Sequence, residues 1–422
     1  MKWILCLLLF FAVPSQNFAQ DIYLNEVLKA SRDKLYRNLV RTTINGNLSK
    51  TLSDSTEENW QNAFGAMELI NYRSPWIDHR IRSGMDSIPG RSINFQRAFL
   101  ELIYTNYPWD FKKPVKELLA QTTDQKIFAM CAEYLLRNGT TAEERSALQE
   151  MVSTRLSQDN GNPFLQELLY RIQPDSTNEI ASQLHEFFQK NYLPGNVLLL
   201  SFQRKNRNYP GLVMVRNAAG IFIKEDDGNY FAVPQLARSI TDLPGYLTNG
   251  NTPQGIFRMY GFDHSKSIFI GPSANIQLTM PFEASASHFY KDSTLPDSLS
   301  DSRLYKKLLP AGLRNYFPLM QAYDAGKAGR TEIIAHGTTI DPSYYKGKEY
   351  YPITPTQGCL CTREIWDEGT GRLQESDQLK LANAITKAGG PYGYAIVIEI
   401  DDRQAPITIN EILPFLKTAE QK

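Results

Sequence analysis

The first part of the chain distributes its apolar residues with the period of an α-helix. Apolar positions recur at helical spacing over residues 24–40, 95–104, 127–136, 164–172 and 180–188. Gly139 follows one of these stretches as a C-terminal cap would, and Thr140 to Glu143 has the form of a capping box that opens the next helix. We therefore predict an all-helical region over residues 20–192. Short polar loops between the helices favour paired hairpins, although no repeat period is evident.

The pattern changes near Pro194-Gly195 to short β-type runs separated by Gly, Asn, Pro and Asp. These runs cover residues 197–202, 212–215, 220–223, 231–233, 256–259, 267–270, 276–280 and 394–400, with a helix predicted over 377–387. The predicted fold class is α+β, with the helical region followed by a β-rich domain over residues 193–422.

The N-terminus has the features of a secretory signal peptide. Lys2 precedes an unbroken apolar run from Trp3 to Val13, which is too short to span a bilayer, and a small residue, Ala19, stands at the predicted cleavage site. Residues 1–19 are therefore predicted to be removed, and the mature chain is expected to be exported to the periplasm or cell envelope. No other segment is predicted to be transmembrane.

Net charge and cysteine content limit the classes of partner and of chemistry that this chain can have. Lys+Arg and Asp+Glu both number 45, and this zero net charge argues against a nucleic-acid partner, which needs a basic excess. Three cysteines remain after signal removal, namely Cys131, Cys359 and Cys361. An odd number in an oxidising compartment indicates at least one functional thiol. No cofactor and no metal site is predicted.

Two segments combine the residue types of nucleophilic catalysis. A hydrophobic run ends in His336-Gly337-Thr338, and a second segment reads Thr356-Gln357-Gly358-Cys359. A histidine beside a cysteine can take the thiol proton, and Gly358 permits a tight turn that aims amides near Cys359 at a developing oxyanion. Cys359 and His336 are therefore the candidate nucleophile and base.

Together these segments resemble the L,D-transpeptidase catalytic domain family, whose signature is a His-Gly dipeptide at a strand end followed by Ser/Thr-His-Gly-Cys. Three flanking segments also resemble the family, namely Thr252-Pro253-Gln254-Gly255-Ile256-Phe257, Tyr316-Phe317-Pro318-Leu319-Met320 ahead of the histidine strand, and a closing strand at 393–398 that follows a helix. The resemblance covers about residues 195–402. It implies peptidoglycan stem peptides as substrate, a role for Gly337 in holding His336, and substrate contacts from Thr356 and Gln357.

The departures from the family pattern concern the residues around the nucleophile. Gln357 replaces the second histidine, so the general-base role is expected to fall on His336 alone. Cys361 replaces the usual Arg or Asn, and Arg363 is a candidate to take over the binding of a substrate carboxylate. Cys361 itself is expected to be a small packed residue, with a resolving thiol or an alternative nucleophile as the other interpretations.

Three hypotheses remain open at this point. The first is an L,D-transpeptidase that forms an acyl-enzyme on Cys359 and passes the acyl group to an amine in cell wall biogenesis. The second uses the same site with water as the acceptor, as an L,D-carboxypeptidase or amide hydrolase. The third is a degenerate wall-binding module, because Gln357 and Cys361 depart from the pattern.

Overall fold

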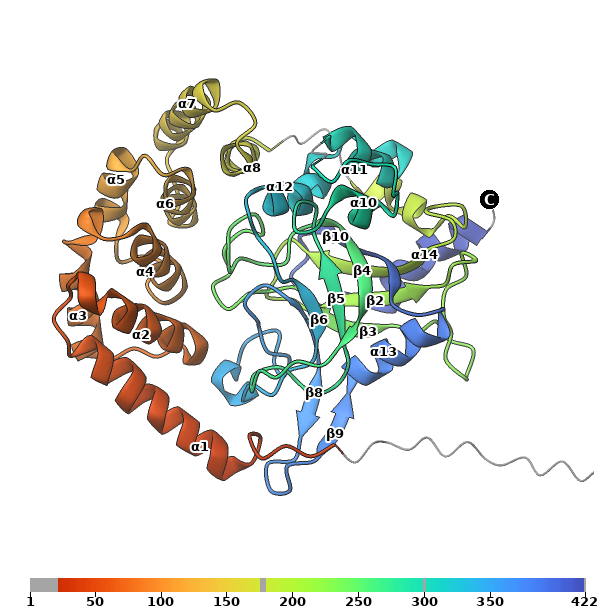
Figure 1. The fold of residues 1–422 in the computed structure, drawn as a ribbon, viewed down its shortest axis with the longest axis horizontal. Helices are drawn as coiled ribbons and strands as arrows, with labels where there is room; N and C mark the ends of the chain where they lie inside the picture. Colours follow the sequence, from red (N-terminus) through yellow and green to blue (C-terminus); the bar gives the residue numbers. More distant parts are fainter. Residues whose placement is uncertain (1–21, 175–179, 299–300, 421–422) are drawn as a thin grey trace, which may run out of the picture.

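The computed structural model describes residues 22–174, 180–298 and 301–420 (Figure 1). The predicted signal peptide, residues 1–19, lies outside the described residues. Helices and an eight-stranded closed barrel are both present, so the mixed α+β class is confirmed. Among the described residues, no helix is both long and apolar enough to cross a lipid bilayer.

Helices account for every regular element before residue 197 in the described part of the chain. They form an arc around one side of the barrel, from α1 beside the β8–β9 hairpin to α8 beside α12 (Figure 1). The elements are α1 (Lys29–Asn38), η1 (Leu39–Gly46), η2 (Asp54–Thr56), α2 (Glu57–Ile70), α3 (Pro75–Met85), η3 (Ile88–Gly90), α4 (Ile93–Asn106), α5 (Lys112–Gln121), α6 (Gln125–Arg137), α7 (Ala142–Gln158), α8 (Pro163–Ile172), α9 (Ile180–Gln183) and η4 (Leu184–Phe188).

Side-chain caps begin several of these helices. Asp124 caps α6 by accepting a hydrogen bond from the amide of Ile127 at 2.8 Å. The capping box of α7 pairs Thr141 with Glu144, one residue later than the predicted pair. Gly139 follows α6 at a φ of +76°, as expected of a C-terminal cap.

A repeat that was not evident in the sequence links the alternate helices α2, α4, α6 and α8. Each carries a glutamate followed by two large apolar or aromatic residues, and the motif recurs about every 33 residues, a period typical of helical repeats. The four copies are Glu68-Leu69-Ile70, Glu101-Leu102-Ile103, Glu133-Tyr134-Leu135 and Glu167-Leu168-Leu169. The motif is short and only partly conserved between copies, which is why periodicity alone did not reveal it.

The second half of the chain forms the barrel, with strand order β1-β10-β4-β5-β6-β7-β3-β2. Its strands are β1 (Val197–Arg204), β2 (Gly211–Arg216), β3 (Val233–Leu236), β4 (Gly255–Asp263), β5 (Asn275–Thr279), β6 (Ile334–His336), β7 (Leu360–Thr362) and β10 (Tyr392–Asp401), and β8 (Glu364–Trp366) pairs with β9 (Leu373–Ser376) as a separate hairpin. Its helices are α10 (Ala286–Tyr290), α11 (Ser302–Leu308), η5 (Ala311–Leu313), η6 (Phe317–Met320), α12 (Gln321–Lys327), η7 (Pro342–Tyr345), α13 (Asp377–Lys387) and α14 (Ile409–Glu420).

Two of the predicted strands are wrong. Residues 220–223 and 267–270 form only single bridges, Arg216 with Phe222 and Ile270 with Thr338. Gly220 has a φ of +84°, which turns the chain out of an extended conformation. In the second segment, the side chain of Ser267 accepts the Phe269 amide and so holds a turn.

Two separate apolar cores mark the change between the halves. The first runs from Ile44 to Ile172 and also takes in Leu243, Tyr246 and Leu247 from the barrel half. The second begins at Ile180, so α9 and η4 pack against the barrel and not against the helices before them. The packing thus changes earlier in the chain than residue 193.

Candidate functional site

Strands β6 and β7 bring the predicted nucleophile and base to neighbouring places in the barrel. They are parallel neighbours in which Ala335 pairs with Leu360 and His336 pairs with Cys361. Ala335 and Leu360 belong to the core inside the barrel. Because side chains alternate along a strand, His336 and Cys361 project from the outer face, whereas Cys359 lies at the bend directly before β7.

The register brings the two predicted catalytic residues close together in the fold. Cys359 stands two positions before Cys361, the partner of His336. No hydrogen bond joins Cys359 and His336; the thiol of Cys359 instead donates to the carbonyl of Glu332 at 3.6 Å.

His336 is held in one orientation by its own neighbour. Its Nδ1 lies 2.7 Å from the carbonyl oxygen of Gly337, which also accepts a hydrogen bond from the Gly271 amide at 2.9 Å. The carbonyl can only accept, so Nδ1 carries the proton and Nε2 is the free, basic nitrogen. Burial lowers the pKa of His336, which keeps the ring neutral near pH 7.

Packing requires a glycine at position 337. A Cβ at this position would overlap the carboxyl group of Glu364 on β8. Glu364 is buried, its Oε1 accepts hydrogen bonds from Ser273 and Ser376, and its Oε2 has no partner among the residues that the structure describes. Burial raises the pKa of Glu364 to about 7. Glu364 is therefore a buried, titratable neighbour of the His336 turn that the sequence did not single out.

A tight turn presents Cys359 at the start of β7. The hydroxyl of Thr356 accepts the Gly358 amide at 3.0 Å and donates to the Cys359 carbonyl at 2.9 Å, and the hydroxyl of Thr252 donates to the Gly358 carbonyl at 2.8 Å. Thr252 opens the segment 252–257, so the fold brings that segment to the Cys359 turn. Gly358 has a φ of +120°, where other residues are strained.

These hydrogen bonds change two of the predicted roles. The Gly358 amide is already engaged by Thr356, so it is not free to face an oxyanion; the Cys359 amide, from which no described residue accepts a hydrogen bond, is a donor next to the thiol. Thr356 is buried and uses its hydroxyl inside the turn, which leaves no group for the predicted substrate contact. Gln357 is exposed beside Cys359.

The three described cysteines differ in access. Cys131 and Cys361 are fully buried, whereas Cys359 is partly exposed. Burial raises the pKa of all three thiols, and for Cys359 the Ile334 amide and the Arg330 guanidinium oppose that rise. Among these thiols, only that of Cys359 is both reachable and close to a cation.

Arg330 is a site residue that sequence reasoning missed. It is buried, and its guanidinium donates to the carbonyls of Gly245, Gly250 and Asn251, the last two at 2.6 and 2.8 Å. A Cβ added to Gly358 would overlap this guanidinium. No ion pair to Arg330 is present in the described part of the chain, so its full charge acts beside Cys359. Burial lowers the pKa of Arg330 to about 10, so it stays charged at neutral pH.

The loop at residues 241–251, whose carbonyls bind Arg330, is hydrogen-bonded to glutamates of the repeat in the helical arc. Glu101 accepts from Asn249 at 3.2 Å, and Glu133 accepts from the Tyr246 hydroxyl at 2.8 Å while pairing with Arg171 at 2.5 Å. Both glutamates are buried. The helical half therefore fixes residues 241–251, and through their carbonyls the position of Arg330.

Arg363, the predicted carboxylate-binding residue, is occupied within the protein. Its guanidinium pairs with Glu375 at 2.9 Å and with Asp377 at 3.2 Å. The structure thus anchors Arg363 at the start of α13 and places Arg330 at the Cys359 turn.

Within the described residues, no group of three or more His, Cys, Asp or Glu side chains is arranged to hold a metal ion.

No protein-family model, curated protein or solved structure matches this chain. The resemblance to the L,D-transpeptidase family thus rests on the sequence segments alone.

Proposed function

We propose that this chain is an exported cysteine acyltransferase of the L,D-transpeptidase type that acts on peptidoglycan stem peptides. The observation that carries the proposal is the arrangement of His336, whose Nδ1–H is held by Gly337 while Nε2 stays free, on the strand that pairs with the strand directly after Cys359. A neutral histidine with a fixed tautomer is the form that removes a proton from a thiol.

In the proposed reaction, the Cys359 thiol transfers its proton to Nε2 of His336 as sulfur attacks the carbonyl of the L-centre of an L,D-peptide bond. The oxyanion that develops faces the Cys359 amide and the positive field of Arg330. His336 returns the proton to the departing D-alanine amine, which leaves a thioester on Cys359. An amine of a second stem then attacks the thioester, gives its proton to His336 and restores the thiol.

The raised pKa of Cys359 makes the base essential in this scheme. A thiol that is protonated at rest needs a proton acceptor in the attack step, and Gln357 cannot serve as one. Cys361 stands directly opposite His336 in the register, but it is fully buried and its thiol donates to the Thr362 carbonyl. Exposure therefore favours Cys359 as the nucleophile over Cys361.

The test uses a purified disaccharide tetrapeptide and the intact mass of the protein after mixing with a carbapenem. We expect the wild type to gain the mass of one carbapenem, and Cys359→Ala to gain none. His336→Ala should be acylated at least a hundredfold more slowly, and Cys361→Ala within a fewfold of the wild type. Acylation of Cys359→Ala but not of Cys361→Ala would show that the wrong thiol is assigned.

The same tetrapeptide separates the proposed transfer from the alternative hydrolysis. A cross-linked dimer as the product means transfer to an amine, whereas a tripeptide with free D-alanine means that water is the acceptor. If wild type and all three variants are equally inert towards both reagents, the wall-binding interpretation replaces the enzyme.

A further inference from the structure

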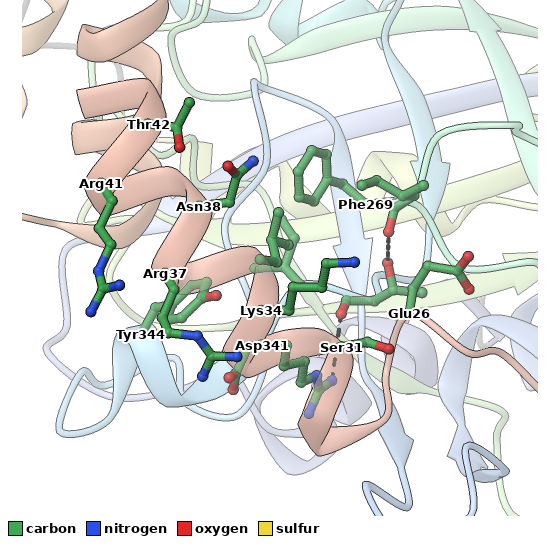
Figure 2. Close-up of a pocket in the computed structure, with 15 residues that line it drawn as sticks. Glu26, Ser31, Lys34, Arg37, Asn38, Arg41, Thr42, Phe269, Asp341 and Tyr344 are labelled. Atoms are coloured by element: carbon green, nitrogen blue, oxygen red, sulfur yellow. Dashed lines mark hydrogen bonds between the residues drawn. The ribbon is translucent and has the colours of Figure 1, made fainter. Parts of the chain in front are cut away.

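A groove separate from the Cys359 turn runs between the first helix and the barrel half (Figure 2). Its volume is about 520 Å³, within the usual range for sites that bind small molecules and peptides. One wall is α1 with the start of η1, and the other is made by residues 268–269 and 339–344. Neither Cys359 nor His336 lines it.

The helical wall carries a row of cations without partners. Lys34, Arg37 and Arg41 are exposed, and in the described part of the chain none of them forms an ion pair. The neighbouring cations differ, because Lys29 pairs with Asp33 and the buried Arg32 pairs with Glu368 at 2.7 Å. From Lys34 to Arg41 the row is about 10 Å long at a rise of 1.5 Å per residue.

The opposite wall is largely apolar. Ile268 is 51% exposed although it is a large hydrophobic residue, and Phe269 and Tyr344 also line the groove (Figure 2). Two acids are also present: Asp341, whose carboxylate accepts the Ser343 amide, and Glu26. A ligand complementary to these walls has several carboxylates, small apolar groups and an amine.

An extended peptide meets these requirements better than a nucleic acid does. A length of about 10 Å corresponds to roughly three extended residues, and alternating side chains would place carboxylates towards α1 and methyl groups towards Ile268 and Phe269. A phosphate backbone would be repelled by the acids Glu26 and Asp341 in the same groove. The protein also has no net positive charge to attract it.

The groove is built on the strand that delivers His336. The hydroxyl of Thr338 donates to the Phe269 carbonyl at 3.0 Å, and the hydroxyl of Thr339 donates to the Ile268 carbonyl. Thr338 follows Gly337 directly, so the wall that carries Ile268 and the His336 turn form one hydrogen-bonded unit. A peptide held in the groove thus lies against a wall that is hydrogen-bonded to the segment directly after His336-Gly337, without entering the Cys359 site.

We propose that this groove binds an acidic stem peptide of peptidoglycan, one that is held and not cleaved, through Lys34, Arg37 and Arg41. The proposal rests on the proposed function for the identity of the peptide. Its role is to keep the enzyme on the wall polymer while the Cys359 site acts on a neighbouring stem.

The experiment measures binding of the disaccharide tetrapeptide by calorimetry to protein carrying Cys359→Ala, which binds without turnover. In that background, Lys34→Glu/Arg41→Glu is compared with Lys113→Glu/Arg314→Glu, which reverses two exposed cations that lie outside the groove and form no ion pair with described residues. We expect the groove variant to bind at least tenfold more weakly, or to lose one of two binding events, and the control to match the parent. The same tetrapeptide with amidated carboxylates should bind the parent as weakly as the groove variant binds the free acid.

Equal affinity of the groove variant and the control, with both folded by circular dichroism, would overturn the groove proposal. The same two double variants are also made in protein that keeps Cys359, and their acylation by a carbapenem is measured. This second measurement distinguishes failure of the groove proposal from failure of the proposed enzyme activity. Groove variants should be acylated at the wild-type rate, because the groove lies outside the reaction centre. If the wild type is not acylated but the groove variant still loses peptide binding, the proposed enzyme fails while the groove remains.

Discussion

Replacing Gly358 with alanine tests whether the Cys359 turn is fixed by the contact with Arg330. At a φ of +120° an added Cβ is strained whatever the surrounding space, and here it would also overlap the Arg330 guanidinium and lie 2.6 Å from the Gly250 carbonyl oxygen. Arg330 cannot retreat without giving up hydrogen bonds to the carbonyls of Gly245, Gly250 and Asn251.

The cost has two parts. Backbone strain at a residue forced into a glycine-only region is about 1–3 kcal/mol, and forcing an extra carbon into a packed site adds about 1–3 kcal/mol. We therefore expect Gly358→Ala to lower the free energy of unfolding by roughly 2–6 kcal/mol. We also expect the thiol of Cys359 to react more slowly with a labelling reagent, since Arg330 must move away to admit the methyl group.

Gly390→Ala is the matched control, measured alongside by urea unfolding. Gly390 has a similar φ of +104°, but the nearest atom to its added Cβ lies at 4.0 Å, so only the backbone part of the cost applies. The loss in free energy of unfolding should be about 1–3 kcal/mol larger for Gly358→Ala than for the control. Only Gly358→Ala should slow labelling of the Cys359 thiol. If the two variants are equally stable and label equally fast, the contact between Gly358 and Arg330 does not hold the turn.

Three further predictions concern charges near the site. Burial raises the pKa of Glu364 from 4.5 to about 7, so its ionisation costs the folded state roughly 3 kcal/mol, a penalty absent below pH 4.5 and complete above pH 7. In urea unfolding, the gain in stability of Glu364→Gln over the wild type should therefore be larger at pH 8 than at pH 4. An equal difference at both pH values would contradict this. Because burial lowers the pKa of His336 from 6.5, the pH profile of Cys359 acylation should fall on its acid side with a midpoint below 6.5, and a midpoint above 7 would be inconsistent with a buried neutral base. Glu133→Gln should lower stability by about 1–3 kcal/mol and slow labelling of Cys359, with the exposed Glu150→Gln as control; unchanged labelling would mean that the helical arc does not position the site.

Local sequence pattern predicted most of the helices and strands and singled out His336 and Cys359 as candidates. Helical and alternating periodicity depend only on which side of an element faces a core, so the change from helices to strands and the span of α13, Asp377–Lys387, could be predicted. His336 and Cys359 could be found because each stands beside a glycine that lets the chain turn. The Gly337 carbonyl that holds His336 was expected from the family resemblance and is confirmed at 2.7 Å.

Tertiary structure alone decided which groups surround the thiol. Arg330 precedes His336 by only six positions, but its partners come from the loop at 245–251, which is fixed in turn by glutamates from the helical arc; no local pattern encodes such contacts between distant segments. The same is true of Arg363, whose charge looked available until Glu375 and Asp377 were found to neutralise it. A sequence shows which side chains carry charge, whereas burial and the partners supplied by other segments determine whether that charge acts on Cys359.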